Sequence, residues 1–369
     1  MNKLLNVMDY KSYFDIPSGL TYFNTPGNGL MPKTHHQWRR RRDIDFFDPS
    51  SDLRDQQVVF IQEVKEALAA MFNCSEENVY CVPNFSFGYN ALLGGLPSGT
   101  RFAILEEDYP SLNYPIISRG FPYKVVKSGD GNLEERILDI IRQGTVDVLL
   151  LSVVQYITGV KIDMEFIKTL KREFPALIVI GDATQYLGTE PFDFMESGFD
   201  AIGGSGYKWM MAGFGNGYMM LSDKLKKFLY SDALTRPRPT EAMWAHKSII
   251  DTFFEPGHQD TLSHGTLLES VRFFDKLGLS NVKEHIDEVK GYAYEQFLER
   301  GWILPAVTER SCRSSLINLQ VPQECYSALG AAGIKCFPRG TGIRIGIHLY
   351  NDKADVDYLV KILDKNIVR

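Results

Sequence analysis

The sequence predicts an α/β protein with a mostly parallel, seven-stranded sheet in a large domain and a smaller α+β C-terminal domain. Two observations lead to this fold class. Between residues 78 and 221, seven short apolar runs alternate with polar or helical stretches, which is the pattern of strands covered by helices on both faces. After Gly257 the alternation gives way to two long helical patterns followed by short strands.

The apolar runs are of strand length and rich in Val, Ile, Leu or Tyr. The seven predicted strands are residues 78–82, 102–105, 123–126, 146–154, 177–180, 201–202 and 217–221. The helices predicted among them are residues 57–71, 133–141 and 164–174. Because parallel sheets place ligand sites at the carboxyl ends of their strands, polar residues that follow these runs are the first candidates for function.

The C-terminal third predicts helices over 265–277 and 281–300, then three short strands and a final helix. The strands are residues 316–321, 334–338 and 342–347, and the helix begins at Ala354. We expect a large domain over 16–256 and a small domain formed by 1–15 together with 257–369. The Pro-rich stretch 232–239 predicts a surface loop rather than a long linker.

Composition and charge exclude several classes of protein. Hydrophobic residues make up 44% of the 369 residues, which is ordinary for a globular chain and too high for a disordered one. The formal net charge is -6, which disfavours nucleic acid as a partner. The basic run Arg39–Arg42 is followed at once by Asp43, Asp45 and Asp48, so a solvated helix face or an interface rim is favoured over an anion-binding patch.

The cysteines and the N-terminus bear on compartment. Five cysteines without a C-x-x-C pair indicate neither a disulfide scaffold nor a metal site, and an odd number fits a reducing cytosol. The first nine residues lack the apolar core of a secretory signal. No window reaches the ~18 apolar residues that a spanning helix needs. We therefore expect a cytoplasmic protein without a membrane segment.

Two charged residues at predicted strand ends carry the strongest chemical signal. A hydrophobic strand runs into Asp182, and a second one leads to Ser205 and Lys208. A buried Asp needs a cationic partner, and a Lys in a Gly-rich apolar turn is a candidate amine nucleophile. Pyridoxal phosphate enzymes use both groups together. On spacing alone, Asp182 could equally cap the next turn, with Lys208 a surface lysine.

The segment Gly181-Asp182-Ala183-Thr184-Gln185, with Ser205-Gly206-Tyr207-Lys208, resembles the cofactor signature of the class V aminotransferase superfamily. That superfamily includes cysteine desulfurases, selenocysteine lyases, isopenicillin N epimerases and kynureninases. Similar blocks extend from Tyr22-Phe23-Asn24 to Arg344-Ile345-Gly346, so the resemblance covers nearly the whole chain. It implies the fold of fold type I pyridoxal phosphate enzymes and a homodimer.

The resemblance also implies the reaction class, though not the member. We expect a pyridoxal 5'-phosphate-dependent enzyme that acts on an amino acid through an external aldimine, as an aminotransferase, epimerase or lyase. The alternatives are a cysteine desulfurase or selenocysteine lyase, and a non-catalytic binding module that keeps the fold. The complete set of motif residues argues against the non-catalytic module.

The resemblance assigns roles around the cofactor. Lys208 would form the Schiff base and shuttle the proton at the substrate α-carbon, while Asp182 would keep the pyridine nitrogen protonated. Gln185 would hydrogen-bond the phenolic oxygen of the ring, and Ser205 would donate to the phosphate. Tyr109, after the strand 102–105, would stack on the ring.

Three further residues are expected at the phosphate. Phe85 and Ser86 begin a helix, where free N–H groups favour an anion, although Ser86 could simply be the N-cap of that helix. Phe85 replaces the usual small residue of the family. His258, in Glu255-Pro256-Gly257-His258, stands where members often have Thr on a loop that reaches the neighbouring subunit's phosphate. A lone His there could also be structural.

The resemblance also implies residues that would bind the substrate. The family uses an Arg at the position of Arg344 to clamp the α-carboxylate, and a planar guanidinium suits that task. Arg339 is a second candidate, for an anion on the substrate side chain. Asn24 and Asn28 would line the mouth of the site. Gln155 and Tyr156 both follow a strand near the ring oxygen, and the sequence does not decide which of them points inward.

The cysteines argue against one member of the superfamily. Desulfurases take sulfur with a cysteine on a flexible loop well upstream of the carboxylate-binding arginine. Here the nearest cysteine, Cys336, lies shortly before Arg344 and near the start of a predicted strand, where a structural role is expected. We therefore expect a transaminase, an epimerase or a cysteine-independent lyase rather than an enzyme that forms a persulfide.

Overall fold

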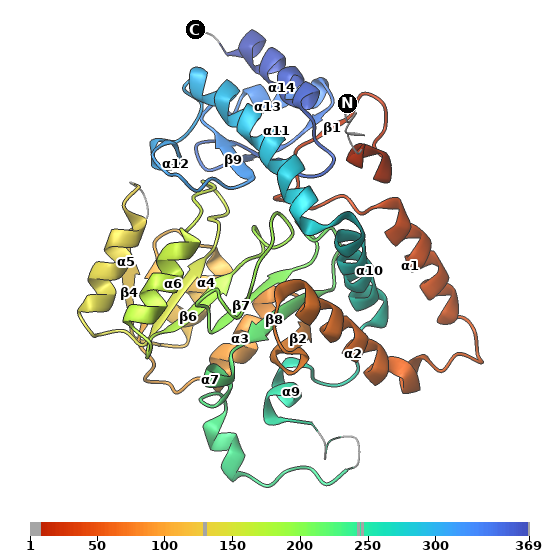
Figure 1. The fold of residues 1–369 in the computed structure, drawn as a ribbon, viewed down its shortest axis with the longest axis vertical. Helices are drawn as coiled ribbons and strands as arrows, with labels where there is room; N and C mark the ends of the chain where they lie inside the picture. The colour runs from red at the N-terminus through yellow and green to blue at the C-terminus, as the bar shows by residue number, and fades with distance from the viewer. Residues whose placement is uncertain (1–8, 128–130, 242–243, 245–246, 368–369) are drawn as a thin grey trace, which may run out of the picture.

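The computed structural model describes residues 9–127, 131–241, 244 and 247–367, and the structural statements below concern these residues. A seven-stranded sheet lies at the centre, with strand order β2-β8-β7-β6-β5-β3-β4 (Figure 1). β8 pairs antiparallel with both of its neighbours, and the other four pairings are parallel. The prediction of a mostly parallel, seven-stranded sheet is confirmed. The strands are β2 (Val79–Val82), β3 (Phe102–Leu105), β4 (Tyr123–Val126), β5 (Val148–Ser152), β6 (Ile178–Asp182), β7 (Ala201–Ser205) and β8 (Gly217–Leu221).

Helices cover both faces of the sheet, because successive strand residues point to opposite sides. On β2, Cys81 packs in the core that α2 (Leu53–Phe72) covers, and Val82 packs in the core under α3 (Phe85–Gly95). The first core also receives α5 (Leu133–Arg142), α6 (Met164–Glu173) and α10 (Thr261–Leu277), and the second receives α4 (Pro110–Ser118) and α9 (Ile249–Phe254).

Two central strands are longer than their apolar runs predict. β6 continues to Asp182 and β7 continues to Ser205, so that Asp182 lies opposite Gly203 and Ser205 lies opposite Gly217. A Cβ atom on Gly203 would stand 2.2 Å from the carbonyl oxygen of Tyr218. Glycine therefore allows close strand pairing here without contributing the apolar side chain from which strands are recognised in sequence.

The C-terminal part combines helices with two small sheets, at the top of Figure 1. One sheet is antiparallel with the order β11-β12-β9, and the other pairs β1 with β10 in parallel. The predicted strand 334–338 is divided at Cys336 into β10 and β11. The elements are α11 (Leu279–Glu299), α12 (Pro305–Thr308), β9 (Leu316–Leu319), α13 (Cys325–Ala331), β10 (Ile334–Lys335), β11 (Phe337–Arg339), β12 (Gly342–Gly346) and α14 (Lys353–Asn366).

The N-terminal segment crosses to this C-terminal part. β1 (Thr21–Tyr22) pairs with β10, and the Asn351 side chain donates to the carbonyl of Tyr22 at 2.9 Å. α1 (Lys33–Asp45) then packs on α10, where Arg39 donates to Thr266 at 2.8 Å. Residues 1–8, on which the prediction of no signal segment and part of the predicted small domain fall, lie outside the described residues.

The remaining elements are short. They are η1 (Tyr10–Tyr13), η2 (Glu76–Asn78), α7 (Asp223–Lys226) and η3 (Ser231–Thr235), and η3 forms the beginning of the predicted surface loop 232–239. Throughout the described part of the chain, no helix has both the length and the apolar character that a bilayer-spanning segment requires.

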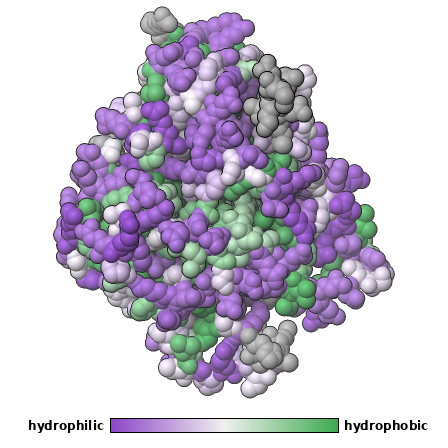
Figure 2. Space-filling model, in the orientation of Figure 1, coloured by the Kyte–Doolittle hydropathy of each residue, from purple (hydrophilic) through white to green (hydrophobic). Residues whose placement is uncertain are grey.

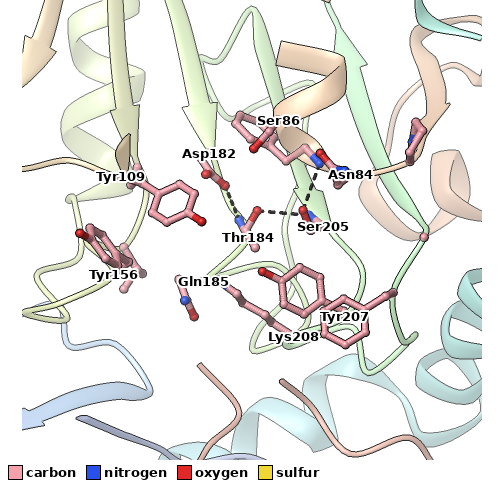
Figure 3. Close-up of a pocket in the computed structure, with 16 residues that line it drawn as sticks. Asn84, Ser86, Tyr109, Tyr156, Asp182, Thr184, Gln185, Ser205, Tyr207 and Lys208 are labelled. Atoms are coloured by element: carbon pink, nitrogen blue, oxygen red, sulfur yellow. Dashed lines mark hydrogen bonds between the residues drawn. The ribbon is translucent and has the colours of Figure 1, made fainter. Parts of the chain in front are cut away.

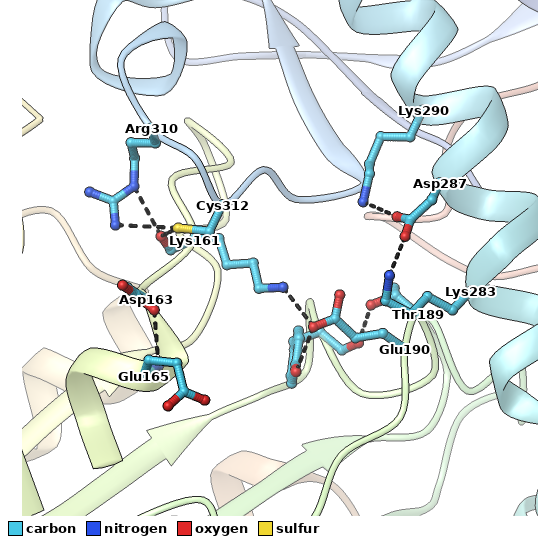
Figure 4. Close-up of polar contacts among 11 residues, drawn as sticks. Lys161, Asp163, Glu165, Thr189, Glu190, Lys283, Asp287, Lys290, Arg310 and Cys312 are labelled. Carbon is cyan, nitrogen blue, oxygen red and sulfur yellow. Dashed lines mark hydrogen bonds and ion pairs between the residues drawn. The ribbon is translucent and has the colours of Figure 1, made fainter. Parts of the chain in front are cut away.

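Buried polar contacts join the C-terminal part to the turn that follows β5 (Figure 4). Arg310 Nε donates to the Lys161 carbonyl at 3.1 Å, and its guanidinium also pairs with Glu134 on α5. The Lys161 ammonium lies 2.7 Å from Glu190. The bonds of Arg310 hold the segment before β9 against the turn that follows β5 and against α5.

Candidate active site

A cavity of about 570 Å³ opens at the carboxyl ends of the central strands, where the parallel sheet predicts a site. Its walls come from the turns after β2, β3, β5, β6 and β7 (Figure 3). The lining residues are Pro83, Asn84, Phe85, Ser86, Tyr109, Ser152, Val154, Tyr156, Asp182, Thr184, Gln185, Ser205, Tyr207, Lys208, Phe214 and Gly215. Seven of the predicted site residues therefore share one cavity: Phe85, Ser86, Tyr109, Asp182, Gln185, Ser205 and Lys208.

Lys208 extends into this cavity between two aromatic rings. Its Nζ lies 6.0 Å from the ring centre of Tyr109 and 5.4 Å from that of Tyr207. Burial lowers the pKa of Lys208 to about 8; the nearby Asp182 carboxylate opposes this shift, and Arg344 reinforces it. A lowered pKa leaves more of the amine neutral near physiological pH, and the neutral amine is the nucleophilic form.

Asp182 ends β6 and is buried. Its Oδ1 accepts a 2.8 Å hydrogen bond from the Thr184 amide. Burial raises the pKa of Asp182, while the bond from Thr184 and the charge of Lys208 lower it. Among the described residues no cation forms an ion pair with Asp182, so its carboxylate can receive a cationic N–H group from a ligand.

A second buried carboxyl group, that of Asp108, lies behind the cavity wall. It accepts hydrogen bonds from the amide and hydroxyl of Ser152 at 2.8 and 2.5 Å, and from the Tyr109 amide at 2.7 Å. Burial raises the pKa of Asp108 to about 6, against these bonds. Asp108 thereby fixes the strand ends that present Tyr109 and Ser152 to the cavity.

The Gln185 amide is oriented by its neighbours. Its Oε1 accepts from the Trp209 indole at 2.7 Å, and its Nε2 donates to the carbonyl of Pro26 at 3.0 Å. His348 Nε2 in turn donates to the Trp209 carbonyl at 2.8 Å. One amide hydrogen of Gln185 is left for a ligand oxygen in the cavity.

The start of α3 forms one corner of the cavity. Asn84 is the N-cap of this helix, since its Oδ1 accepts from the Phe87 amide at 2.9 Å. The interpretation of Ser86 as the N-cap is wrong, because Ser86 is already the second helical residue. The Phe85 amide donates to Ser205 Oγ at 3.0 Å, so the Ser205 hydroxyl hydrogen remains available to an anion near the helix N-terminus.

The two candidate arginines lie on the β11–β12 hairpin. Arg344 is 4% exposed and donates from Nη1 to the Tyr156 carbonyl at 2.7 Å. Its buried Nε has no hydrogen-bond partner among the described residues. Arg339 is exposed, and its guanidinium lies 5.1 Å from the Phe337 ring centre. Neither arginine is part of the cavity lining itself.

The side chains of Gln155 and Tyr156 have different roles. Gln155 Oε1 accepts from the Ile157 and Thr158 amides at 2.7 Å each, and its Nε2 donates to the Glu107 carbonyl at 2.9 Å. The Gln155 side chain thus holds the turn together, while Tyr156 lines the cavity with its ring 5.1 Å from that of Tyr109. This contact answers the question that the sequence left open.

The remaining candidates lie outside the cavity lining. His258 is exposed, on the loop between α9 and α10. Asn28 belongs to a turn that packs on the cavity floor, where the Gly29 amide donates to the Tyr207 carbonyl at 2.9 Å. A Cβ atom on Gly29 would stand 2.0 Å from the Lys208 carbonyl oxygen, so only glycine allows this approach. Asn24 Oδ1, in the same turn, is buried without a partner among the described residues.

No role was predicted for Asp108, Thr184, Tyr207 or Trp209, which lie in or beside the cavity. Each lies inside or beside a motif that the sequence offered, so proximity in sequence was the available signal. Tyr207 stacks on Phe214 with ring centres 4.6 Å apart, and this pair forms the wall beside Lys208. Burial raises the pKa of Tyr207 to about 12, so it stays a neutral hydrogen-bond donor.

Comparisons with known proteins agree with this geometry. The family model described as aminotransferase class-V matches residues 50–359. An uncharacterized aminotransferase of Bacillus subtilis, YcbU, is 21% identical over 313 residues, which cover 80% of this chain and 81% of that protein. A probable cysteine desulfurase of Methanothermobacter thermautotrophicus is 22% identical over 235 residues, covering 61% of this chain and 58% of the other.

Solved structures share the fold. A cysteine desulfurase from Thermococcus onnurineus superposes with a TM-score of 0.83 at 14% identity, covering 97% of each chain. The cystine C–S lyase C-DES, solved with its product cysteine persulfide, superposes with a TM-score of 0.82 at 16% identity, covering 95% of this chain and 99% of that one. At these identities the superpositions show the fold alone.

Proposed function

This chain belongs to the class V aminotransferase family, and from that premise we propose that Lys208 is the residue that binds its pyridoxal 5'-phosphate. The protein is a pyridoxal phosphate-dependent enzyme of the fold type I class that acts on an amino acid. The observation that carries the assignment is the pairing, in one cavity, of a buried lysine of lowered pKa with a buried carboxylate.

The donor set fits this cofactor. Asp182 offers an uncompensated buried carboxylate to a protonated ring nitrogen, and Gln185 offers an amide hydrogen to the ring oxygen. The Ser205 hydroxyl and the N-terminus of α3 offer donors to a phosphate, with Ser86 in the first turn. Tyr109, which also lines the cavity, offers an aromatic ring on which the cofactor ring could stack.

The chain's own groups then have distinct tasks in the reaction. When bound, the cofactor supplies an electron-withdrawing ring that stabilises negative charge at the substrate α-carbon. Asp182 keeps a proton on the ring nitrogen, and Lys208 takes and returns the proton at the α-carbon. Arg344 binds the α-carboxylate, for which its buried and unpartnered Nε is suited. Val154, which is buried, and Phe214 supply apolar surface beside these groups.

Among the reactions of the family, we favour transamination, epimerisation or a cysteine-independent elimination. A persulfide mechanism needs a reactive cysteine near Lys208, and none of the five cysteines lines the cavity. Cys336 is fully buried, and burial raises its pKa to about 12, so little thiolate forms. The desulfurase named among the relatives is thus a weaker guide to the reaction than to the fold.

The assignment is tested with the purified protein loaded with pyridoxal phosphate. We expect a visible absorbance band that borohydride removes, with the cofactor then found by mass spectrometry on the peptide that contains Lys208. Lys208→Ala should lose the reducible link, whereas Lys161→Ala, which changes a lysine paired with Glu190, should keep it. A protein that stays colourless would favour the non-catalytic module, and a reducible link on another lysine would refute the role of Lys208.

We also propose that the working unit is a homodimer that pairs through α1 and α2. Val58 and Val59 on α2 are each 75% exposed, and Ile44, Phe46 and Phe47 add further exposed apolar surface at the end of α1. Figure 2 shows green surface near that end of α1, at the right-hand edge. The loop that holds the exposed His258 lies beside α2, because Gln57 on α2 donates to the Gln259 carbonyl at 3.0 Å. Two-fold pairing is the commonest closed symmetry.

The dimer is tested by light scattering at micromolar concentration. The unmodified protein should have twice the mass of one chain, and Val58→Asp with Val59→Asp should give a monomer. Val125→Asp, at an exposed valine on β4, is the matched control and should leave the mass unchanged. A monomeric mass for the unmodified, cofactor-loaded protein would contradict the proposal, together with the role of His258 at a partner's phosphate.

We also propose the division into two domains and a cytoplasmic location. The division into a large domain of residues 16–256 and a small domain of residues 1–15 and 257–369 is supported by the separate small sheets of the C-terminal part, although α10 packs on α1 and α2. Limited proteolysis near residue 257 tests it. A cytoplasmic location is supported by five unpaired cysteines, which suit a reducing compartment. Cell fractionation tests that location.

A further inference from the structure

We propose that the substrate carries a second anionic group besides its α-carboxylate, and that Arg339 is the residue that binds it. This inference rests on the proposed function, because it takes Arg344 as the partner of the α-carboxylate. It adds the substrate class: an amino acid with a carboxylate or sulfinate on its side chain.

Arg339 and Arg344 project from the same face of one hairpin. In the antiparallel pairing of β11 with β12, Phe337 lies directly opposite Arg344, and residues opposite each other share a face. Arg339 follows two residues after Phe337, so it shares that face as well. The Arg339 guanidinium lies 5.1 Å from the Phe337 ring centre, which gives it a packed resting position on that face of the hairpin.

The backbone that carries Arg339 is fixed against the cavity wall. Asn318 Nδ2 donates to the Arg339 carbonyl at 2.8 Å and to the Ile157 carbonyl at 2.9 Å, and so bridges the hairpin to the turn that presents Tyr156. Gln323 Nε2 donates to the Gly340 carbonyl at 2.7 Å. A Cβ atom on Gly340 would stand 2.5 Å from the Ile157 side chain, and φ of +59° there also favours glycine. Arg339 is therefore held in place rather than carried on a loose loop.

The charges at the site are unbalanced. Arg339 and Arg344 are cationic, and the lining of the neighbouring cavity holds one carboxylate among the described residues, that of Asp182 beside the Lys208 amine. Neither arginine forms an ion pair with a carboxylate among the described residues, and each lowers the pKa of Lys208. Burial and the charge of Arg339 lower the pKa of Arg344 to about 10. One α-carboxylate compensates one guanidinium, and a second anion on the substrate compensates the other.

The first experiment uses non-reactive ligands and the cofactor-loaded protein. Succinate carries two carboxylates, and succinamate replaces one of them with an amide of similar size; glutarate and glutaramate form a longer pair. In calorimetric titrations, each diacid should bind roughly 10- to 100-fold more tightly than its half-amide, the range of a charge-assisted hydrogen bond. Equal affinities within both pairs would overturn the proposal.

Variants then locate the second anion. In Arg339→Gln the preference for the diacids should fall toward one, while Arg339→Lys should keep part of it. Arg300→Gln, which changes an arginine paired with Asp364 on the C-terminal helices, is the matched control and should keep the full preference. A preference that survives in Arg339→Gln would also refute the proposal, since the second anion would then bind elsewhere.

Amino acids give the decisive comparison. L-aspartate, L-glutamate and L-cysteine sulfinate should change the absorbance of the bound cofactor at lower concentration than L-asparagine, L-glutamine and L-alanine. The acid that responds first distinguishes a side-chain carboxylate from a sulfinate, and a short side chain from a longer one. A visible cofactor band that responds only to neutral amino acids would overturn this inference and leave the proposed function intact. Failure to form the band at all would remove both.

Discussion

The indole Nε1 of Trp209 donates a 2.7 Å hydrogen bond to Oε1 of Gln185, and both side chains are buried. This bond decides which way the Gln185 amide points, since the oxygen is taken by the indole and the nitrogen faces Pro26 and the cavity. Trp209 also follows Lys208 directly in sequence. One residue thus couples the position of the nucleophilic amine to the orientation of the amide that would contact the cofactor ring.

Trp209→Phe should therefore impair the site more than the fold. Loss of the indole N–H leaves Gln185 Oε1 without its donor and lets the amide turn over, which should cost about 1–3 kcal/mol of unfolding free energy. We expect a shift in the absorbance maximum of the bound cofactor and a lower kcat. Trp302→Phe, at a tryptophan buried in the C-terminal part, should leave the absorbance unchanged. An unaltered spectrum in Trp209→Phe would contradict the positioning role.

The lowered pKa of Lys208 predicts a pH dependence for covalent attachment of pyridoxal phosphate to the cofactor-free protein. Only the neutral amine attacks an aldehyde, so the rate should rise with pH and level off above about 8, rather than near the 10.5 of an ordinary lysine. Stopped-flow absorbance from pH 6 to 10 measures this. Asp182→Asn removes a charge that raises the pKa and should move the midpoint down, and Arg344→Gln should move it up.

The same pKa shift affects stability with a definite sign. Between about pH 8 and 10.5 the unfolded chain keeps the Lys208 proton while the folded, cofactor-free protein has lost it. The free energy of unfolding should consequently rise with pH across this window. Denaturant titrations of Lys208→Met should lack this rise. An equal pH dependence in that variant would mean that other groups cause it.

Cys336 should contribute to stability, and its thiol should be unreactive. It is fully buried between β10 and β11, and burial raises its pKa to about 12. Cys336→Ser places a hydroxyl in that apolar environment and should cost about 1–3 kcal/mol of stability, while Cys336→Ala should cost less and keep full turnover. Incubation with cysteine should leave no stoichiometric persulfide on Cys336. A persulfide there, with activity lost in Cys336→Ser, would restore the desulfurase interpretation.

The Arg310–Glu134 pair should anchor the C-terminal part. The Arg310 side chain is 6% exposed, so Arg310→Met leaves the Glu134 carboxylate without its cation, with the Asp163 amide as a remaining donor, and should lower stability by about 3 kcal/mol. Adding Glu134→Leu should recover much of the loss. Arg300→Met, at a more exposed pair with Asp364, should lower stability by about 0–1 kcal/mol. Thermal unfolding of all the variants measures these losses. Equal losses at the two arginines would show that the buried pair has no special role.

The sequence predicted the centre of the cavity better than its rim. Asp182, Gln185, Ser205 and Lys208 follow adjacent parallel strands, and the geometry of such a sheet brings strand ends together whatever the loops do. The strand ends themselves were missed at Gly203 and Gly204, because glycine carries no apolar side chain from which a strand could be recognised. Motif and resemblance therefore predicted residues that share the cavity but not the last residues of β6 and β7.

Choices between neighbouring residues could not be made from sequence. Asn84 and Ser86 are both good caps, and only the bond from Phe87 to Asn84 shows which of them caps α3. From the sequence, Gln155 and Tyr156 were equally good candidates to face the cavity. The structure shows that the Gln155 amide instead forms hydrogen bonds within its own turn. The predicted strand 334–338 was read as one element, and its division at Cys336 depends on pairing with β1, which lies over 300 residues earlier.

The pairing of β1 with β10 has a consequence for how the protein is made. The turn that packs Gly29 against the backbone of Lys208 is anchored by partners such as Lys335, Gly346 and Asn351, so its position depends on the last segments to leave the ribosome. The central sheet can form while the chain is still growing, but the floor of the cavity cannot. A nascent chain that presents Lys208 on a folded sheet is consequently still unable to hold an amino acid, and catalytic competence arrives only after residue 351 has been synthesised.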